Sequence, residues 1–437
     1  LKLITMTTAE LTKKEILLES LSALDFSSEP LFAKNLRVEA KKALTQLEFP
    51  TGKTEYWKYT RIGKIINNNY SVATSKQSNK IEITKYLIPE LDTHVVVLIN
   101  GFYHEELSKI ETQKGVKIHS LKNAIAEEDG FIKAHLAQIS KAENEIFIAI
   151  NTWSFTDGVY IDLEKNAVVE KPIHILNIIT ENNNITNTRT IVKAHDNSGV
   201  KIIESFVNIN SKNSFTNNVA EFFLNPNSKV EYNKIQNKEG ESYQVSTEQV
   251  HQRANSIFNI NTITLAGTLV RNNLNIEVNA EGCETNLNGV YLGKDNNHID
   301  NHTIVKHLKP NCTSNEVYKG VLDNSSVGVF NGKVIVSPDA QKTNSFQKNN
   351  TILLTNEAVI NSKPELEIYA NDVKCSHGST TGQLDEEAIF YLQARGISKQ
   401  SAINLMIAAF IKDAIESISI ESLKNYINKK IEERFEK

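Results

Sequence analysis

Short hydrophobic runs separated by polar turns fill the middle of the chain. From residue 146 to about 367, segments such as Val159-Tyr160-Ile161 and Val334-Ile335-Val336 alternate with Asn, Asp, Gly and Ser, and helical periodicity is missing. Such a long series of short strands is typical of a solenoid, in which each strand stacks on its neighbour in the next coil. We therefore expect a mainly β fold with a right-handed parallel β-helix core over residues 146–370. The repeat is irregular, so a β-sandwich is the alternative.

The turns of this region are rich in asparagine, while the whole chain has 8 prolines. Asn tolerates the left-handed backbone region, and its side chains can form ladders from one coil to the next. The composition of the turns therefore favours the solenoid.

Hydrophobic residues recur at helical spacing at both ends of the chain. At the start, residues 11–21 and 121–136 look helical, residues 71–80 read as a polar loop and residues 82–99 as strands, which predicts a helical and mixed domain over 8–145. At the end, Asp385 is a candidate N-cap, Gly396 stands where that helix should stop, and an apolar stripe follows from Ala402 to Ile415. We expect a C-terminal helical domain over residues 371–437.

An aromatic segment, TEYWKYT at residues 54–60, follows the helix-breaking Pro50-Thr51-Gly52. Three aromatic rings between charged residues could form a ligand platform, but such a segment is more often the packed edge of a domain. We interpret it as packing.

Charge and cysteine content narrow the functional classes. The 48 Lys and Arg residues against 52 Asp and Glu give a net charge of −4, so no overall positive field favours nucleic acid or an anionic membrane.

The chain contains three cysteines, Cys283, Cys312 and Cys375. This odd, small number argues against a disulfide framework and for a reducing compartment. No apolar run is long enough to span a bilayer, and no export signal opens the sequence, so we expect a cytoplasmic protein.

Common catalytic signatures, including nucleotide-binding glycine loops and zinc-protease motifs, are absent from the sequence, which predicts a non-catalytic protein. The segment that stands out is Asp372 to Ser379, where Cys375 and His377 are two residues apart. On a strand this spacing places both side chains on one face. Thiolate and imidazole are ligands for iron in clusters and for zinc, so one hypothesis is that Cys375 and His377 contribute to a shared or transient metal site. The alternative is a buried Cys beside a structural His.

The other candidate ligands are better explained structurally. On a strand, His298 and His302 lie on one face and His307 on the other, so the three cannot readily converge. Cys283 and Cys312 lack neighbouring ligands in the sequence and read as buried thiols.

The stretch NDVKCSHGSTTGQLDEEAIFYLQARGI, residues 371–397, closely resembles the signature of the SufB/SufD family of iron–sulfur cluster assembly proteins. Further similarity lies in residues 317–322, 328–334, 340–343 and 364–368, and in the aromatic segment near the N-terminus. The resemblance covers nearly the whole chain. It is closer to the SufD branch, because His377 is followed by Gly-Ser-Thr where the SufB branch typically has Glu-Ala-Thr.

The resemblance implies a partner-dependent scaffold. It implies a SufB-type paralogue joined edge to edge through the β-helices, a SufC-type ATPase docked on the C-terminal helices, and a transient iron–sulfur cluster shared with the SufB-type subunit. His377, with Cys375, would supply ligands to that nascent cluster. The expected docking residues for the ATPase are Phe390, Leu392, Met406, Phe410 and Ile411.

Two other functions are compatible with the sequence. One is a SufB-like stand-alone scaffold that builds clusters on a homodimer, and the other is a sugar-cleaving β-helix enzyme, for which no cluster of Asp or Arg is visible in the β region. Flavin has been associated with complexes of the family, but no dinucleotide fingerprint is legible here.

Overall fold

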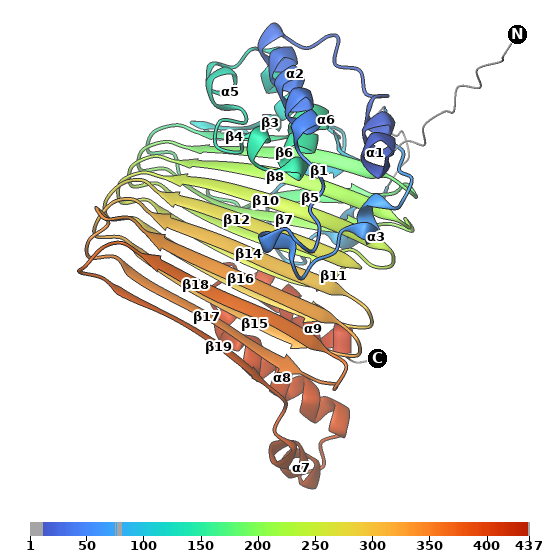
Figure 1. The fold of residues 1–437 in the computed structure, drawn as a ribbon, viewed down its shortest axis with the longest axis vertical. Helices are drawn as coiled ribbons and strands as arrows, with labels where there is room; N and C mark the ends of the chain where they lie inside the picture. The colour runs from blue at the N-terminus through green and yellow to red at the C-terminus, as the bar shows by residue number, and fades with distance from the viewer. Residues whose placement is uncertain (1–11, 75, 77–80, 436–437) are drawn as a thin grey trace, which may run out of the picture.

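The computed structural model describes residues 12–74, 76 and 81–435. From β4 onward, successive strands alternate between two sheets in which neighbouring strands are parallel (Figure 1). The first sheet runs, from one edge to the other, through β2 (Phe102–Tyr103), β1 (His94–Ile99), β5 (Ile173–Ile179), β7 (Gly199–Asn208), β9 (Lys229–Asn237), β11 (Ile257–Ala266), β13 (Glu284–Gly293), β15 (Thr313–Leu322), β17 (Asn344–Leu353) and β19 (Lys374–Gly382). The second runs through β3 (Val116–Ser120), β4 (Asp157–Leu163), β6 (Ile185–Ala194), β8 (Ser214–Leu224), β10 (Ser242–Gln252), β12 (Leu269–Val278), β14 (His298–His307), β16 (Val327–Val336) and β18 (Val359–Ile368).

The coils stack in register. Glu284 pairs with Thr313, Thr313 with Asn344 and Asn344 with Lys374, all in parallel. Antiparallel pairing is found where β1 meets β2 and β3 meets β4. The predicted parallel solenoid is confirmed, and the β-sandwich alternative is wrong because a sandwich is built from antiparallel sheets.

Asparagine ladders stabilise the turns, as expected. Asn166, Asn197 and Asn227 have φ values of 64°, 57° and 61°, which lie in the left-handed region. Asn197 donates its side-chain amide to Asn166 at 2.9 Å, and Asn227 donates to Asn197 at 3.0 Å. Each turn therefore satisfies the amide of the next coil.

The space between the sheets contains both apolar and charged side chains. Ile175, Ile202, Phe222 and Phe258 belong to the apolar part. Lys234 of β9 and Glu248 of β10 form an ion pair at 2.7 Å with both side chains fully buried. A charge buried to this extent is tolerated because its partner is in contact with it.

Helices cover the outer faces of the two sheets (Figure 1). The N-terminal elements pack mainly on the second sheet: α1 (Lys13–Leu21), α2 (Leu31–Gln46), η1 (Glu55–Trp57), α3 (Gly63–Ile66), α4 (Leu121–Ala126), α5 (Gly130–His135), η3 (Ala142–Asn144) and α6 (Ile146–Ser154), with η2 (Thr84–Tyr86) lying beside β1. The C-terminal helices are α7 (Glu386–Ala394), α8 (Lys399–Ile415) and α9 (Glu421–Phe435), and the last two pack on the first sheet.

Some elements differ from the sequence-based ranges. Helix α6 begins at Ile146, where a change to strands was expected; that expectation was wrong because α6 is buried on all sides, so its apolar run lacks helical periodicity. Strand β19 lies beyond residue 370, inside the range expected to be helical, and β1 contributes to the first sheet although it precedes residue 146. Residues 8–11 and 436–437 of the predicted ranges lie outside the described residues.

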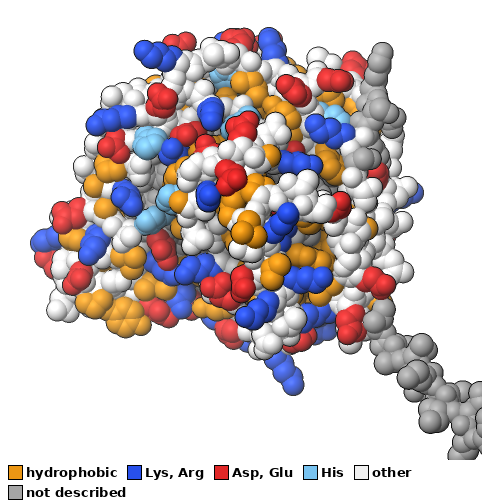
Figure 2. All heavy atoms as spheres, turned by 90° about the horizontal axis from the view of Figure 1, so that it is seen from above, with side chains coloured by type: hydrophobic (Ala, Val, Ile, Leu, Met, Phe, Trp, Pro, Cys, Tyr) orange, Lys and Arg blue, Asp and Glu red, His pale blue; other side chains and the backbone are white. Residues whose placement is uncertain are grey.

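Side chains of opposite charge are interspersed over the face shown in Figure 2, which views the molecule from the end that carries α2 and α5. Within the described ranges, no helix has both the length and the apolar character needed to cross a membrane.

Candidate functional site

Cys375 and His377 lie on β19, the strand that ends the first sheet. Their in-register partners on β17 are Ser345 and Gln347, and both partners are buried between the sheets. Since in-register residues of neighbouring parallel strands project to the same side, Cys375 and His377 face the interior of the solenoid at its last coil. The sequence-based expectation that the two share one face is confirmed.

The last coil leaves this pair accessible. Cys375 is half-buried against apolar residues that include Val373, and this burial raises the pKa of its thiol. His377 is exposed. In the described part of the chain, no strand pairs with the outer edge of β18 or β19, and no three His, Cys, Asp or Glu side chains gather closely enough to hold a metal ion. Two donors alone make an incomplete site, so further ligands would have to come from another molecule.

Polar side chains line the interior behind the pair. Behind Cys375, the hydroxyls of Ser345 and Ser314 lie 2.7 Å apart, and Ser314 Oγ is 2.9 Å from His307 Nε2. Burial lowers the pKa of His307 to about 4, so this imidazole is neutral at pH 7. The hydroxyls and the imidazole therefore form an uncharged hydrogen-bonded row that leads inward from the candidate ligand.

A buried carboxyl group lies behind His377. Gln347 Nε2 donates to Glu316 Oε2 at 2.8 Å, and Thr303 Oγ1 donates to Glu316 Oε1 at 2.7 Å. Burial raises the pKa of Glu316 to about 7, although both hydrogen bonds act to lower it. Sequence reasoning missed Gln347 and Glu316. No signal in the sequence points to them, because their approach to His377 depends on the in-register pairing of successive coils.

His298 and His302 are structural, as expected. Both lie on the outer face of β14, where Thr60 hydrogen-bonds to His298 at 2.8 Å and also to Asp300, while His302 Nε2 is 2.9 Å from Asp300 Oδ1. Burial lowers the pKa of both histidines.

The aromatic segment packs against the same region of the second sheet. The guanidinium of Arg271 stacks 4.2 Å from the Trp57 ring, and Trp57 lies 5.4 Å from Phe147. Thr60 and Trp57 therefore attach residues 54–60 to the second sheet beside a cavity of about 450 Å³. The interpretation as packing is confirmed for Trp57 alone, because Tyr56 and Tyr59 are exposed.

Cys283 and Cys312 occupy the same turn position on neighbouring coils and are fully buried free thiols. Both thiols donate to the carbonyl oxygen of Ala280, at 3.3 and 3.1 Å. Their interpretation as buried thiols is confirmed.

The residues expected to dock an ATPase divide into two groups. Phe390 of α7 is 73% exposed, and Leu392 and Met406 are half-buried. Phe410 is half-buried beneath Lys319 of β15, whose ammonium lies 4.6 Å from the ring, and Ile411 is 1% exposed inside the core between α8 and the first sheet. Ile411 is therefore not available at the surface, because its side chain completes that core.

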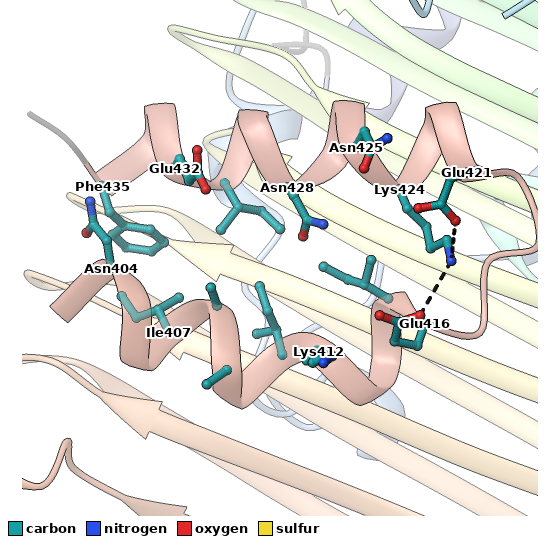
Figure 3. Close-up of a pocket in the computed structure, with 15 residues that line it drawn as sticks. Asn404, Ile407, Lys412, Glu416, Glu421, Lys424, Asn425, Asn428, Glu432 and Phe435 are labelled. Atoms are coloured by element: carbon teal, nitrogen blue, oxygen red, sulfur yellow. Dashed lines mark hydrogen bonds and ion pairs between the residues drawn. The ribbon is translucent and has the colours of Figure 1, made fainter. Parts of the chain in front are cut away.

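A groove of about 320 Å³ separates α8 from α9 (Figure 3). Its floor is apolar, with Ile407 and Phe435 among the contributors, and its rim is polar. At one end Lys424 bridges Glu416 at 3.4 Å and Glu421 at 2.7 Å. The residues that line the groove come from α8, α9 and the turn between them.

Comparisons with known proteins agree with this arrangement. Residues 177–410 match the family model described as SUF system FeS cluster assembly, SufBD core domain, and residues 17–175 match the SufBD protein N-terminal region. An iron–sulfur cluster assembly SufBD family protein of Synechocystis is 28% identical over 92% of this chain and 91% of its own length. The iron–sulfur cluster assembly protein SufD of Escherichia coli is 28% identical over 91% and 92%, and a chloroplastic protein of Arabidopsis thaliana is 27% identical over 94% and 87%.

The core model alone spans more than half of the chain, and its boundaries include the last coil with Cys375 and His377. The chain therefore belongs to the SufB/SufD family of SUF-system iron–sulfur cluster assembly proteins.

Proposed function

We propose that this chain is a SufD-type, non-catalytic scaffold subunit that pairs with a SufB-type paralogue and a SufC-type ATPase to build and transfer nascent iron–sulfur clusters. The observation that carries the proposal is the pair of soft-metal donors, Cys375 and His377, on β19, the last strand of the solenoid, whose outer edge pairs with no strand of the described residues. A strand edge with unpaired backbone groups invites a second strand, and a two-donor site requires further ligands. A paralogous β-helix docked on this coil supplies both. The three unpaired cysteines suit a reducing compartment such as the cytoplasm.

In this function the iron–sulfur cluster is cargo. Imidazole nitrogen and thiolate sulfur are ligand types found in such clusters, and a ligand set divided between two subunits can be opened by moving them apart. The raised pKa of Cys375 keeps its thiol protonated until metal displaces the proton. His377 binds without that step when its ring is neutral, so we assign it the leading ligand role.

The test compares wild type with His377→Ala in anaerobic co-purification with SufB-type and SufC-type partners. We expect the variant to form the complex while iron and acid-labile sulfide fall to background. Ser376→Ala is the matched control, because Ser376 is a neighbour on the same strand whose side chain points to the opposite face. Normal cluster loading by His377→Ala would refute the ligand role.

The same preparation addresses the alternative of a stand-alone homodimeric scaffold, which the open edges of β18 and β19 also allow. A homodimer that holds iron and sulfide stoichiometrically without partners would replace the proposed function.

We propose α7 and the neighbouring part of α8, which carry Phe390, Leu392 and Met406, as the docking region for the ATPase. Phe390 exposes 73% of its surface, and a large exposed aromatic residue is a typical anchor of an interface. Phe390→Ala should lower the affinity for the ATPase at least tenfold, as measured by surface plasmon resonance, without changing thermal stability. Leu31→Ala on α2 is the control, since Leu31 is equally exposed at the other end of the molecule. Equal affinities of the two variants would contradict this docking region.

A further inference from the structure

Gln347 is buried directly behind the candidate ligand His377. It is 3% exposed, and its backbone pairs in register with that of His377 on the next strand. Side chains at paired positions of neighbouring parallel strands project to the same side and lie next to each other. The amide of Gln347 therefore lies beside the inner side of the imidazole.

The orientation of the Gln347 amide is fixed by two neighbours. Its nitrogen donates to Glu316 on the preceding coil at 2.8 Å, so the amide oxygen points away from Glu316. On the opposite sheet, a Cβ atom at Gly332 would lie 2.3 Å from Gln347 Nε2, closer than any real Cβ contact. The glycine thus leaves the space that the amide occupies, and a larger residue would displace it.

The oxygen of this amide is unsatisfied. Within the part of the chain that the structure describes, Gln347 Oε1 is buried and has no hydrogen-bond partner. A buried acceptor without a donor is destabilising, so an acceptor held in this way needs an explanation. A histidine that binds a metal through one ring nitrogen usually donates the N–H of the other nitrogen to a carboxylate or carbonyl oxygen, which fixes the ring orientation.

We propose that Gln347 is a positioning residue for His377: Gln347 Oε1 accepts the N–H of one ring nitrogen, which turns the other nitrogen toward the metal. This inference rests on the proposed ligand role of His377. The donor comes from the last coil, the acceptor from the coil before it, and Glu316 with Gly332 holds the acceptor in place.

The test measures Co²⁺ binding to the full chain by anaerobic calorimetry. Gln347→Leu keeps the approximate volume and removes the acceptor, and we expect about 10- to 100-fold weaker binding. In Gln347→Glu, the new carboxyl group and Glu316 share one proton, which replaces the hydrogen bond between the two side chains and leaves an acceptor oxygen for His377. This variant should bind Co²⁺ with an affinity within a few-fold of wild type. Phe346→Leu, a change on the exposed face of the same strand, is the control.

A second readout needs no metal. The ¹⁵N shifts of the His377 ring report which nitrogen carries the proton, and Gln347→Leu should change the tautomer ratio relative to wild type. The proposal is overturned if Gln347→Leu leaves the ¹⁵N shifts of His377 unchanged and binds Co²⁺ as tightly as wild type. It is also overturned if those shifts are unchanged and Co²⁺ binding is too weak to measure in every variant. If His377→Ala loses Co²⁺ while Gln347→Leu binds normally, the positioning role alone fails. If His377→Ala also binds normally, the ligand role fails first.

Discussion

Replacing Glu316 by glutamine isolates the effect of one buried carboxyl group on stability. In the wild type, Glu316 accepts hydrogen bonds from Thr303 and Gln347. A glutamine at this position can accept from Gln347 and donate to Thr303, whose hydroxyl can act as donor or acceptor. The substitution therefore keeps both hydrogen bonds and removes the titration.

The magnitude follows from the pKa. Burial raises the pKa of Glu316 from its ordinary value of 4.5 to about 7, so between these values the folded protein binds more protons than the unfolded chain. The free energy of unfolding must then decrease as the pH rises through this window. At about 1.36 kcal/mol per pKa unit, the loss from this group reaches about 3 kcal/mol above pH 7.

Urea unfolding of wild type and Glu316→Gln at several pH values, followed by tryptophan fluorescence, measures this difference. We expect similar unfolding free energies at about pH 4 and an advantage of about 2–3 kcal/mol for the variant at about pH 8. Glu281→Gln, which changes an exposed carboxylate, should show no such divergence. A difference between wild type and Glu316→Gln that stays constant with pH would refute the reasoning, because a group that titrates alike in both states cannot produce a pH-dependent stability.

Two further substitutions test the packing that builds the solenoid. Gly289→Ala places a Cβ 2.2 Å from the ring of Tyr318, and we expect a loss of about 1–3 kcal/mol or more, measured as a lower urea midpoint. Retention of the wild-type midpoint would show that the ring can move aside. Arg189→Ala leaves Glu221 unpaired, because the two fully buried side chains are 2.9 Å apart, and should cost about 3–5 kcal/mol in the free energy of unfolding. Lys133→Ala, which breaks an exposed ion pair, should cost less than about 1 kcal/mol, and an equal effect of both changes would contradict the role of burial.

The solenoid could be predicted because its turns carry a local signal. Asn197 and Asn227 show in the sequence as polar turn residues, and they perform the expected role as left-handed, laddered positions. Helix α6 could not be recognised from its pattern, since a helix buried on all sides has the same uniform apolar run as a buried strand. Strand β19 was included in the range expected to be helical, because its polar sequence lacks the alternation of a half-buried strand, although the spacing of Cys375 and His377 had been interpreted on a strand.

The sequence predicted the two candidate ligands of the site but not the buried residues behind them. Cys375 and His377 are neighbours along the chain, so their shared face followed from strand alternation. Gln347 and Glu316 lie one and two coils away, and their approach depends on the in-register stacking of coils of unequal length. That register is set by tertiary packing, which a single irregular sequence does not specify.

The attachment of the aromatic segment to β14 has a consequence for synthesis of the chain. Thr60 contacts Asp300, which follows it by 240 residues. At roughly 5–20 residues per second, a ribosome needs roughly 10–50 s to make the residues between them. Phe147 and Arg271, against which Trp57 packs, are made before Asp300, so the aromatic segment gains its contacts one after another and completes its docking only after β14 has been made. A growing chain therefore carries Thr60 without its buried partner for the whole of that interval.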